Sequence, residues 1–182
     1  MKIIAVIPAR GGSKRIPLKN IIDFKGKPII AWTIEAAKKS MSFDRIIVST
    51  DNFEIAEVAK SYGIEVPFLR KDKSDDFSTV TEATLEAIDQ AEDYYDEKYD
   101  IIVQLMANAP LRNDVDICDH LENFINSNNL FQISSFRFGW MNPWWAFKMK
   151  NASEHEWMLK EGIGKRSQDL DQLYCPSGAI WI

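Results

Sequence analysis

Short apolar runs alternate with longer amphipathic segments along most of the chain. Continuous apolar runs at residues 3–7, 46–48 and 101–105 have the length and composition of buried strands. Residues 66–69 predict a further short strand, and residues 131–136 predict one more. Strands that alternate with helical segments in this way are typical of an α/β fold with a parallel or mostly parallel sheet and helices on both faces.

Four helices are predicted between these strands. The first begins at Pro28, because proline at the first helical position leaves no backbone donor unpaired. The second follows the cap-like residues 49–52 and is closed by Gly63 in the left-handed conformation. The third opens at Thr79, which has capping-box spacing to Glu82. The apolar stripe of the fourth helix consists of Val115, Cys118, Leu121 and Ile125.

Residues 137–165 interrupt this pattern. Four of the six tryptophans lie there, without sustained helical or strand periodicity. Tryptophans of this kind either fill a local core or anchor an interface, and the sequence favours neither explanation. We therefore expect a single domain over residues 1–182 that carries residues 137–165 as an inserted arm.

Composition and charge exclude several classes of function. The chain has 22 Lys and Arg against 27 Asp and Glu, and its net charge of −5 argues against nucleic acid or an anionic membrane as a partner. No apolar run approaches the ~20 residues that span a bilayer, and no signal-peptide pattern is present. Two cysteines and two histidines argue against a disulfide framework or a zinc site, so a cytoplasmic location is expected.

A basic loop with two adjacent glycines, residues 8–20, follows the first strand. Its four cations are Arg10, Lys14, Arg15 and Lys19. Ligands of open α/β sheets bind beyond the carboxyl ends of the strands, and Gly11 and Gly12 allow backbone amides to approach an anion. The loop matches neither the P-loop nor the dinucleotide fingerprint. A solvated loop with glycines in turns is the alternative, but the charge of the loop favours an anionic ligand.

This loop and several later segments resemble a known enzyme family. IPARGGSKRIPLKNI is similar to the signature of the cytidylyltransferases that activate sialic acid and related nonulosonic acids as CMP-sugars. The resemblance continues through GKPIIAWTIEAA, FDRIIVSTDNFEIAEVAKSYGIEVPFLR, NAPLR and RSQDLDQLYCPSGAIWI, and so covers nearly the whole chain. It implies a Rossmann-like nucleotidyltransferase fold, CTP and an acidic nonulosonate sugar as substrates, Mg²⁺ dependence and usually a homodimer. Residues 137–165 correspond to the dimerisation arm.

The resemblance also implies roles for individual residues. Arg10 and Lys19 would be catalytic, with Lys19 near the leaving pyrophosphate. The nucleotide site would comprise Ala9, Arg10, Gly11, Gly12, Lys14, Lys19, Asn20, Arg70 and Asn108. Arg166 and Gln168 would bind the sugar, whose carboxylate an arginine can pair with in a bidentate way. The metal ligands stay unknown.

Departures from the family pattern leave alternatives open. Met106 stands where many sialate enzymes have a Gln associated with nucleotide recognition, and Gln104 lies two residues earlier on the same strand face. This altered segment is more similar to that of pseudaminate-type enzymes. Cys175 and Ser177 replace an Arg and an Asn of some members, and Asn108 stands where octulosonate enzymes have a metal-binding Asp.

The acidic Asp-x-Asp segment that follows GAIYI in the family is not found after GAIWI, so the C-terminal part of the family domain is expected to be missing. Asp51, Asp75 and Asp76 remain as loop acids that could face a ligand, but the sequence favours capping or solvent exposure for them. A catalytically silent nucleotide-binding homologue and a 3-deoxy-manno-octulosonate-type cytidylyltransferase are therefore kept as alternatives. The segments KNI and RSQDL favour the nonulosonate branch.

Overall fold

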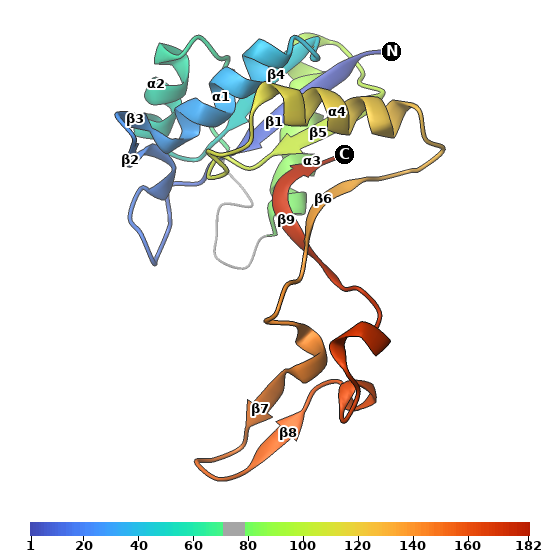
Figure 1. The fold of residues 1–182 in the computed structure, drawn as a ribbon. Helices are drawn as coiled ribbons and strands as arrows, with labels where there is room; N and C mark the ends of the chain where they lie inside the picture. The colour runs from blue at the N-terminus through green and yellow to red at the C-terminus, as the bar shows by residue number, and fades with distance from the viewer. Residues whose placement is uncertain (71–78) are drawn as a thin grey trace. The chain divides into compact units, whose positions relative to one another are not determined.

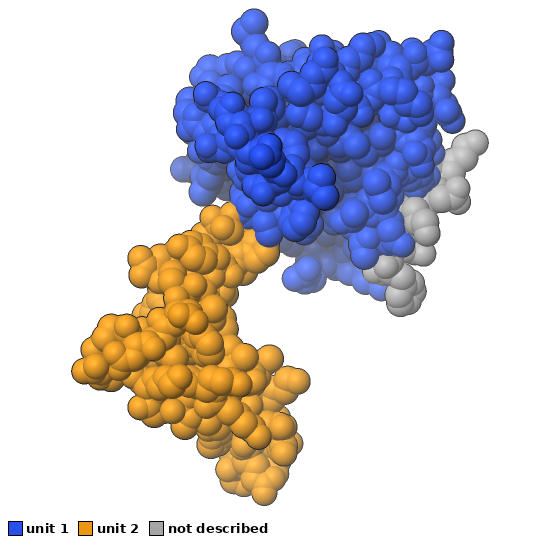
Figure 2. All heavy atoms as spheres, turned by 90° about the vertical axis from the view of Figure 1, so that its right-hand side faces the viewer, with its two compact units in different colours: residues 1–134, 178–182 blue, residues 135–177 orange. Residues whose placement is uncertain are grey.

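The computed structural model describes residues 1–70 and 79–182. The chain divides into two compact units, which Figures 1 and 2 show. Unit 1 comprises residues 1–134 and 178–182, and unit 2 comprises residues 135–177. The α-helices of the described residues all belong to unit 1.

A five-stranded sheet with the strand order β4-β1-β5-β9-β6 forms the centre of unit 1. The strands are β1 (Ile3–Pro8), β4 (Arg45–Ser49), β5 (Ile101–Leu105), β6 (Ile133–Arg137) and β9 (Tyr174–Trp181). β1 pairs in parallel with both β4 and β5, whereas β9 runs antiparallel to β5. The prediction of a mostly parallel sheet is confirmed.

Helices cover both faces of this sheet (Figure 1). They are α1 (Ile29–Ser40), α2 (Phe53–Ser61), α3 (Val80–Tyr95) and α4 (Asp114–Ile125). Buried residues of α1, α2 and α4 pack on one face, among them Ile34, Ile55 and Ile117. On the other face α3 packs through Ala87 and Ile88. A strand covered on both faces needs apolar side chains at successive positions, which explains the continuous apolar run of β1.

The predicted helix ends are largely confirmed. Thr79 and Glu82 form a reciprocal capping box at the start of α3. Asn52 caps α2, where its side-chain oxygen accepts a hydrogen bond of 3.0 Å from the amide of Ile55. Gly63 follows α2 with φ +72°, the left-handed conformation expected of it. Local side-chain chemistry therefore determines where these helices begin and end.

Two predictions about element bounds are wrong. Pro28 is the N-cap residue of α1 rather than its first helical residue, because it pairs with Asp23 in a small hairpin. This hairpin consists of β2 (Asp23–Phe24) and β3 (Lys27–Pro28). Residues 66–69 form no strand; the pairing there is an isolated bridge between Ile47 and Glu65, which ends before them.

The predicted apolar stripe of α4 is wrong in part: Leu121 is buried as predicted and Cys118 is half-buried, but the two end positions are not. Val115 and Ile125 are exposed, whereas Ile117 and Leu121 are buried and Phe124 packs against the core. Both sets of positions satisfy a helical period, so periodicity alone could not choose between them. The packing of α4 against α1 selects the face that carries Ile117 and Leu121.

Unit 2 is built from short elements. It contains a hairpin of β7 (Phe147–Met149) and β8 (His155–Trp157) and the 3-10 segments η2 (Pro143–Trp145), η3 (Lys160–Gly162) and η4 (Ser167–Asp169). Trp157 packs edge-on against Phe147 in the hairpin. The indole of Trp144 donates a hydrogen bond of 2.9 Å to the carbonyl of Asp171. These two tryptophans therefore serve local packing.

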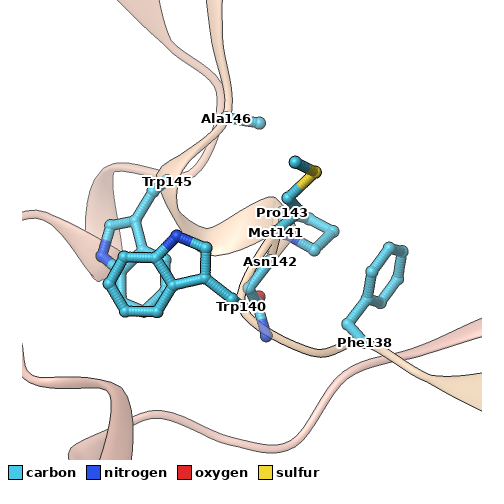
Figure 3. Close-up of a pocket in the computed structure, with 7 residues that line it drawn as sticks. All are labelled: Phe138, Trp140, Met141, Asn142, Pro143, Trp145 and Ala146. Carbon is cyan, nitrogen blue, oxygen red and sulfur yellow. The ribbon is translucent and has the colours of Figure 1, made fainter.

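Other aromatic side chains of unit 2 surround an open apolar hollow of about 590 Å³ (Figure 3). The rings of Trp140 and Trp145 lie 6.2 Å apart, and Phe138 lines the same hollow. Trp140 is 87% exposed and Met141 is 89% exposed. Unit 2 thus combines packed tryptophans with a solvent-facing apolar surface.

Among the helices of the described residues, none is long and apolar enough to span a membrane.

Candidate functional site

A cavity of about 230 Å³ lies where the loops after β1 and β5 meet. These two strands are parallel neighbours, so the segments that leave their carboxyl ends emerge at the same edge of the sheet. Arg70, the cap residue Thr79 and the first turn of α3 complete the walls among the described residues. The lining residues are Pro8, Arg10, Lys19, Asn20, Arg70, Thr79, Val80, Ala83, Met106 and Asn108.

Five of the residues assigned to a nucleotide site from the sequence line this cavity together. They are Arg10, Lys19, Asn20, Arg70 and Asn108. They come from three segments that are far apart in the chain. Three of the five are cationic, and no carboxylate belongs to the lining among the described residues. The cavity therefore has the electrostatic character of an anion site.

The remaining residues of the predicted nucleotide site do not line the cavity. Ala9 is fully buried, and its amide donates a hydrogen bond of 2.9 Å to the carbonyl of Ser49. Gly12 and Lys14 are exposed in the loop. The amide of Gly11 donates a hydrogen bond of 2.8 Å to Oδ1 of Asp51. These residues shape or flank the loop rather than the cavity wall.

The two ends of the basic loop are joined by Asn20. This side chain is 6% exposed, and its Nδ2 donates a hydrogen bond of 3.0 Å to the carbonyl of Arg10. Lys19 and Asn20 belong to a 3-10 turn, η1 (Lys19–Ile21), that follows Leu18 in the left-handed conformation. Asn20 thus holds Arg10 and Lys19 on the same side of the site.

Arg70 is a buried cation at the cavity wall. It is 4% exposed, its Nη1 donates to Oγ of Ser49 at 3.2 Å, and its Nε has no hydrogen-bond partner among the described residues. Burial lowers the pKa of Arg70, the carboxylates of Asp51 and Glu86 oppose this shift, and Arg10 adds to it. A buried guanidinium with an unused donor is costly, and a bound anion would offset that cost.

Met106, rather than Gln104, faces the cavity. Gln104 is 6% exposed, and its Oε1 accepts a hydrogen bond of 2.8 Å from the hydroxyl of Thr84 on α3. The amide group of Gln104 is therefore engaged inside the fold and does not replace the Gln that Met106 displaces. A thioether forms this part of the wall.

Arg112 is a structurally important residue for which no role was predicted. It is 6% exposed, and its guanidinium donates to Oγ1 of Thr33 on α1 at 2.7 Å and to the carbonyl of Ala179 on β9. The Thr33 hydroxyl lies 3.1 Å from the carbonyl of Met106, to which it donates. Burial lowers the pKa of Arg112 to about 10, and Asp116 opposes this shift. Arg112 therefore ties the loop after β5 to α1 and β9. The quoted segment NAPLR contained this residue, but nothing in the segment indicated burial.

Acidic side chains near the cavity do not form a metal site. Within residues 1–70 and 79–182 there is no group of three or more His, Cys, Asp or Glu that could hold a metal ion. Asp51 faces the basic loop and accepts a hydrogen bond from it. Asp75 and Asp76 lie outside the described residues. The donor set that the structure describes does not fit a protein-ligated Mg²⁺ site, which needs oxygen ligands from several groups.

The two residues assigned to the sugar belong to unit 2. Arg166 forms a bidentate pair with Asp169, with Nε 2.7 Å from Oδ2 and Nη2 3.0 Å from Oδ1. Gln168 lines a hollow of about 520 Å³ together with Arg137, Trp145 and Gln172. Both residues are exposed, and each lies in or beside η4. Unit 2 therefore carries a polar site that is separate in composition from the cavity of unit 1.

Comparison with known proteins points to one enzyme family. The model of a family described as cytidylyltransferase matches residues 4–161. A pseudaminic acid cytidylyltransferase of Campylobacter jejuni is 42% identical over 184 residues, which cover all of this chain and 78% of that protein. An N-acylneuraminate cytidylyltransferase of Streptococcus agalactiae is 34% identical over 184 residues, which cover all of this chain and 43% of that protein.

The fold has close counterparts among solved structures. A CMP:2-keto-3-deoxy-manno-octonic acid synthetase complexed with CTP superimposes with a TM-score of 0.72 at 19% identity. The superposition covers all of this chain and 73% of that one. At this identity the likeness concerns the fold, and it agrees with the Rossmann-like nucleotidyltransferase architecture expected from the sequence.

Thr33→Val should destabilise the protein, because it removes the hydroxyl that links Arg112 to the carbonyl of Met106 while keeping the side-chain shape. We expect the free energy of unfolding in urea to fall by about 1–3 kcal/mol, since a buried donor loses its acceptor. Thr81→Val, at an exposed position of α3, is the control and should change stability by less than about 0.5 kcal/mol. Equal losses in both variants would show that the hydroxyl network contributes nothing.

Proposed function

Because this chain belongs to the cytidylyltransferase family, we propose that it transfers CMP from CTP to a nonulosonic acid and releases pyrophosphate. One observation carries the proposal. Arg10, Lys19 and Arg70 converge with two amide side chains on a single cavity. They do so in a chain that is 42% identical, over its whole length, to a pseudaminic acid cytidylyltransferase.

The proposed reaction exchanges one bond to phosphorus for another. The anomeric hydroxyl of the sugar attacks the α-phosphorus of CTP, the bond to the pyrophosphate oxygen breaks, and the hydroxyl proton is lost. Catalysis of such a step rests on positioning and on neutralisation of the charge that develops on oxygen. Lys19 and Arg10 are the residues proposed to supply that charge, since both line the cavity. Asn20 holds the carbonyl of Arg10 and so fixes the start of the loop.

Arg70 is proposed to bind the triphosphate as well. The Nε donor of its buried guanidinium has no partner among the described residues, and a phosphate oxygen is a strong acceptor for such a group. Asn108, which lines the same cavity, is neutral and is proposed as a hydrogen-bonding contact to the nucleotide. Gly11, Gly12, Lys14 and Ala9 would support this site through the shape and charge of the loop.

Mg²⁺ stays the proposed cofactor on the ground of family membership. The described residues do not provide a set of carboxylates for it, so no step is assigned to the ion here. A nucleoside triphosphate coordinates Mg²⁺ through its own phosphate oxygens, so a requirement for Mg²⁺ is compatible with this cavity. A cytoplasmic location likewise stays part of the proposal.

Pseudaminic acid is the acceptor that we propose first. The pseudaminic acid enzyme shares 42% of residues with this chain, compared with 34% for the N-acylneuraminate enzyme. The loop after β5, with Met106 at the cavity wall, is in keeping with that choice. Arg166 is proposed to pair with the sugar carboxylate, for which it would exchange its partner Asp169. Gln168 would add a hydrogen bond beside it.

The full chain, incubated with CTP, Mg²⁺ and a panel of nonulosonic acids, is expected to release pyrophosphate with the matching sugar and to do so fastest with pseudaminic acid. Pyrophosphate is measured by a coupled assay, and the CMP-sugar by mass spectrometry. CTP binding without turnover on any acid would favour the catalytically silent alternative. Turnover with 3-deoxy-manno-octulosonate alone would favour the octulosonate-type alternative.

Lys19→Ala should retain the fold and lose most of the rate, because a cation that faces the leaving group is removed. We expect kcat to fall by at least about 100-fold, the usual size of such an electrostatic contribution. Lys25→Ala, an exposed lysine in the β2–β3 turn, is the matched control and should turn over like the parent. Unchanged turnover of Lys19→Ala would remove this lysine from the mechanism.

Unit 2 is proposed to act as a dimerisation arm, since Trp140 and Met141 leave a contiguous apolar surface in solvent. We expect the parent protein to sediment as a dimer and the double variant Trp140→Ser/Met141→Ser to sediment as a monomer with unchanged secondary structure. Met41→Ser, which alters a residue of unit 1 that is 90% exposed, is the control and should stay dimeric. A double variant that remains dimeric would contradict the assignment.

A further inference from the structure

The segment at residues 49–52, which joins β4 to α2, contacts the basic loop at two points. The carbonyl of Ser49 accepts a hydrogen bond of 2.9 Å from the amide of Ala9. Oδ1 of Asp51 accepts a hydrogen bond of 2.8 Å from the amide of Gly11. A Cβ atom at position 11 would lie only 2.8 Å from Cβ of Asn52, so the loop can rest on the segment only with glycine there.

The same segment also holds the buried arginine of the cavity. The amide of Arg70 donates a hydrogen bond of 2.8 Å to the carbonyl of Thr50. Nη1 of Arg70 donates to Oγ of Ser49 at 3.2 Å. The carboxylate of Asp51 acts on the Arg70 guanidinium electrostatically and favours its charged form. Residues 49–52 therefore contact both the basic loop and Arg70, which together supply the cations of the cavity. Of these four residues, only Asp51 was a candidate from the sequence.

Residues 49–52 are held in place by hydrogen bonds within the segment and to α2. Asn52 caps α2, because its side-chain oxygen accepts a hydrogen bond from the amide of Ile55. The backbone amide of Asn52 donates a hydrogen bond of 3.1 Å to Oγ1 of Thr50. Ser49 and Thr50 are completely buried. Because α2 packs into the core through Ile55, the segment offers the loop a rigid surface.

We propose that residues 49–52 are the positioning element of the cavity and that Asp51 is the positioning residue that fixes the basic loop for the triphosphate. This inference rests on the proposed function and adds a residue to it. A carboxylate beside an anion site repels the anion, so its presence there needs a separate structural role. Here the carboxylate of Asp51 accepts a charge-assisted hydrogen bond from a backbone amide, which is stronger than a neutral one. It also favours the charged form of Arg70.

One consequence concerns Gly11. Its amide is already used by Asp51, so Gly11 serves the site by allowing the close approach to Asn52. The triphosphate would then depend on the side chains of Arg10, Lys19 and Arg70. The hydrogen bond to Asp51 holds the basic loop that carries the first two, and Ser49 and Thr50 hold Arg70.

The chain offers a matched control for Asp51 at the other end of the same strand pair. Oδ2 of Asp44, just before β4, accepts a hydrogen bond of 2.7 Å from the amide of Ile3 at the start of β1. Asp44 and Asp51 thus make the same kind of bond between the same two strands, at opposite edges of the sheet. Only Asp51 lies at the edge that carries the cavity.

The test compares Asp51→Ala, Asp51→Asn and Asp44→Ala by calorimetric titration with CTP in the absence of any sugar. We expect Asp51→Ala to weaken CTP binding by about tenfold or more, as the loss of a charge-assisted bond predicts. Asp51→Asn keeps an acceptor oxygen and should bind CTP within about threefold of the parent. Asp44→Ala should lower the melting temperature and leave the affinity for CTP unchanged.

Amide hydrogen exchange in the protein without ligand gives a second readout. The Gly11 amide should exchange at least about tenfold faster in Asp51→Ala than in the parent, while Asp51→Asn restores protection. Unchanged exchange at Gly11, an Asp51→Ala variant with the parent's affinity for CTP, or an Asp51→Asn variant as impaired as Asp51→Ala would each overturn the inference. A parent protein that binds no CTP would defeat the proposed function instead, and the exchange at Gly11 would still decide the role of Asp51.

Discussion

The parallel pairing of β1 with both of its neighbours is the constraint on which the rest of unit 1 depends. The register sets Pro8 opposite Ser49 and Val6 opposite Gln104, so β4, β1 and β5 end at one edge of the sheet. The basic loop, the segment at residues 49–52 and the loop that carries Met106 leave from that edge. The contacts between these segments follow from this register, because the groups that meet there are separated by tens of residues in the chain. A shift by one residue would turn the buried side chains of β1 to the opposite faces, so the core and the site are specified together.

Two buried arginines show how one side chain can serve function or structure. Arg112 directs its guanidinium to a hydroxyl and a carbonyl of the fold, and it joins three elements. Arg70 lines the cavity, and its Nε, like that of Arg112, has no hydrogen-bond partner among the described residues. Burial of either cation costs free energy, and in Arg112 the hydrogen bonds to Thr33 and Ala179 offset part of that cost. For Arg70 a bound anion would supply part of the compensation, so folding stability and ligand binding are linked at this residue. The net charge of the chain is −5, so the cationic cavity is the place where the proposed triphosphate would be attracted.

Much of unit 1 could be predicted from the sequence because local rules decide it. The runs that became β1, β4 and β5, the capping box at Thr79 and the left-handed Gly63 depend only on near neighbours. The buried face of α4 could not be predicted, since two apolar sets share one helical period and only packing distinguishes them. The positive charge of the basic loop predicted an anion site. Arg112 and Ser49 carried no such signal, because their roles arise from hydrogen bonds to residues brought close by the sheet. In unit 2 the tryptophans divided between packing and exposure, which composition alone could not separate.

The contact between Gly11 and Asn52 has a consequence for how this chain can change in evolution. A side chain at position 11 would overlap Asn52, whose own side chain caps α2. Positions 11 and 52 therefore form a coupled pair: because the clash is with Cβ of Asn52, a larger residue at position 11 is accessible only after glycine at position 52, which would weaken the helix cap only slightly. The order of substitutions is thus restricted to one direction, and the basic loop is free to vary at its exposed tip long before it can vary at its base.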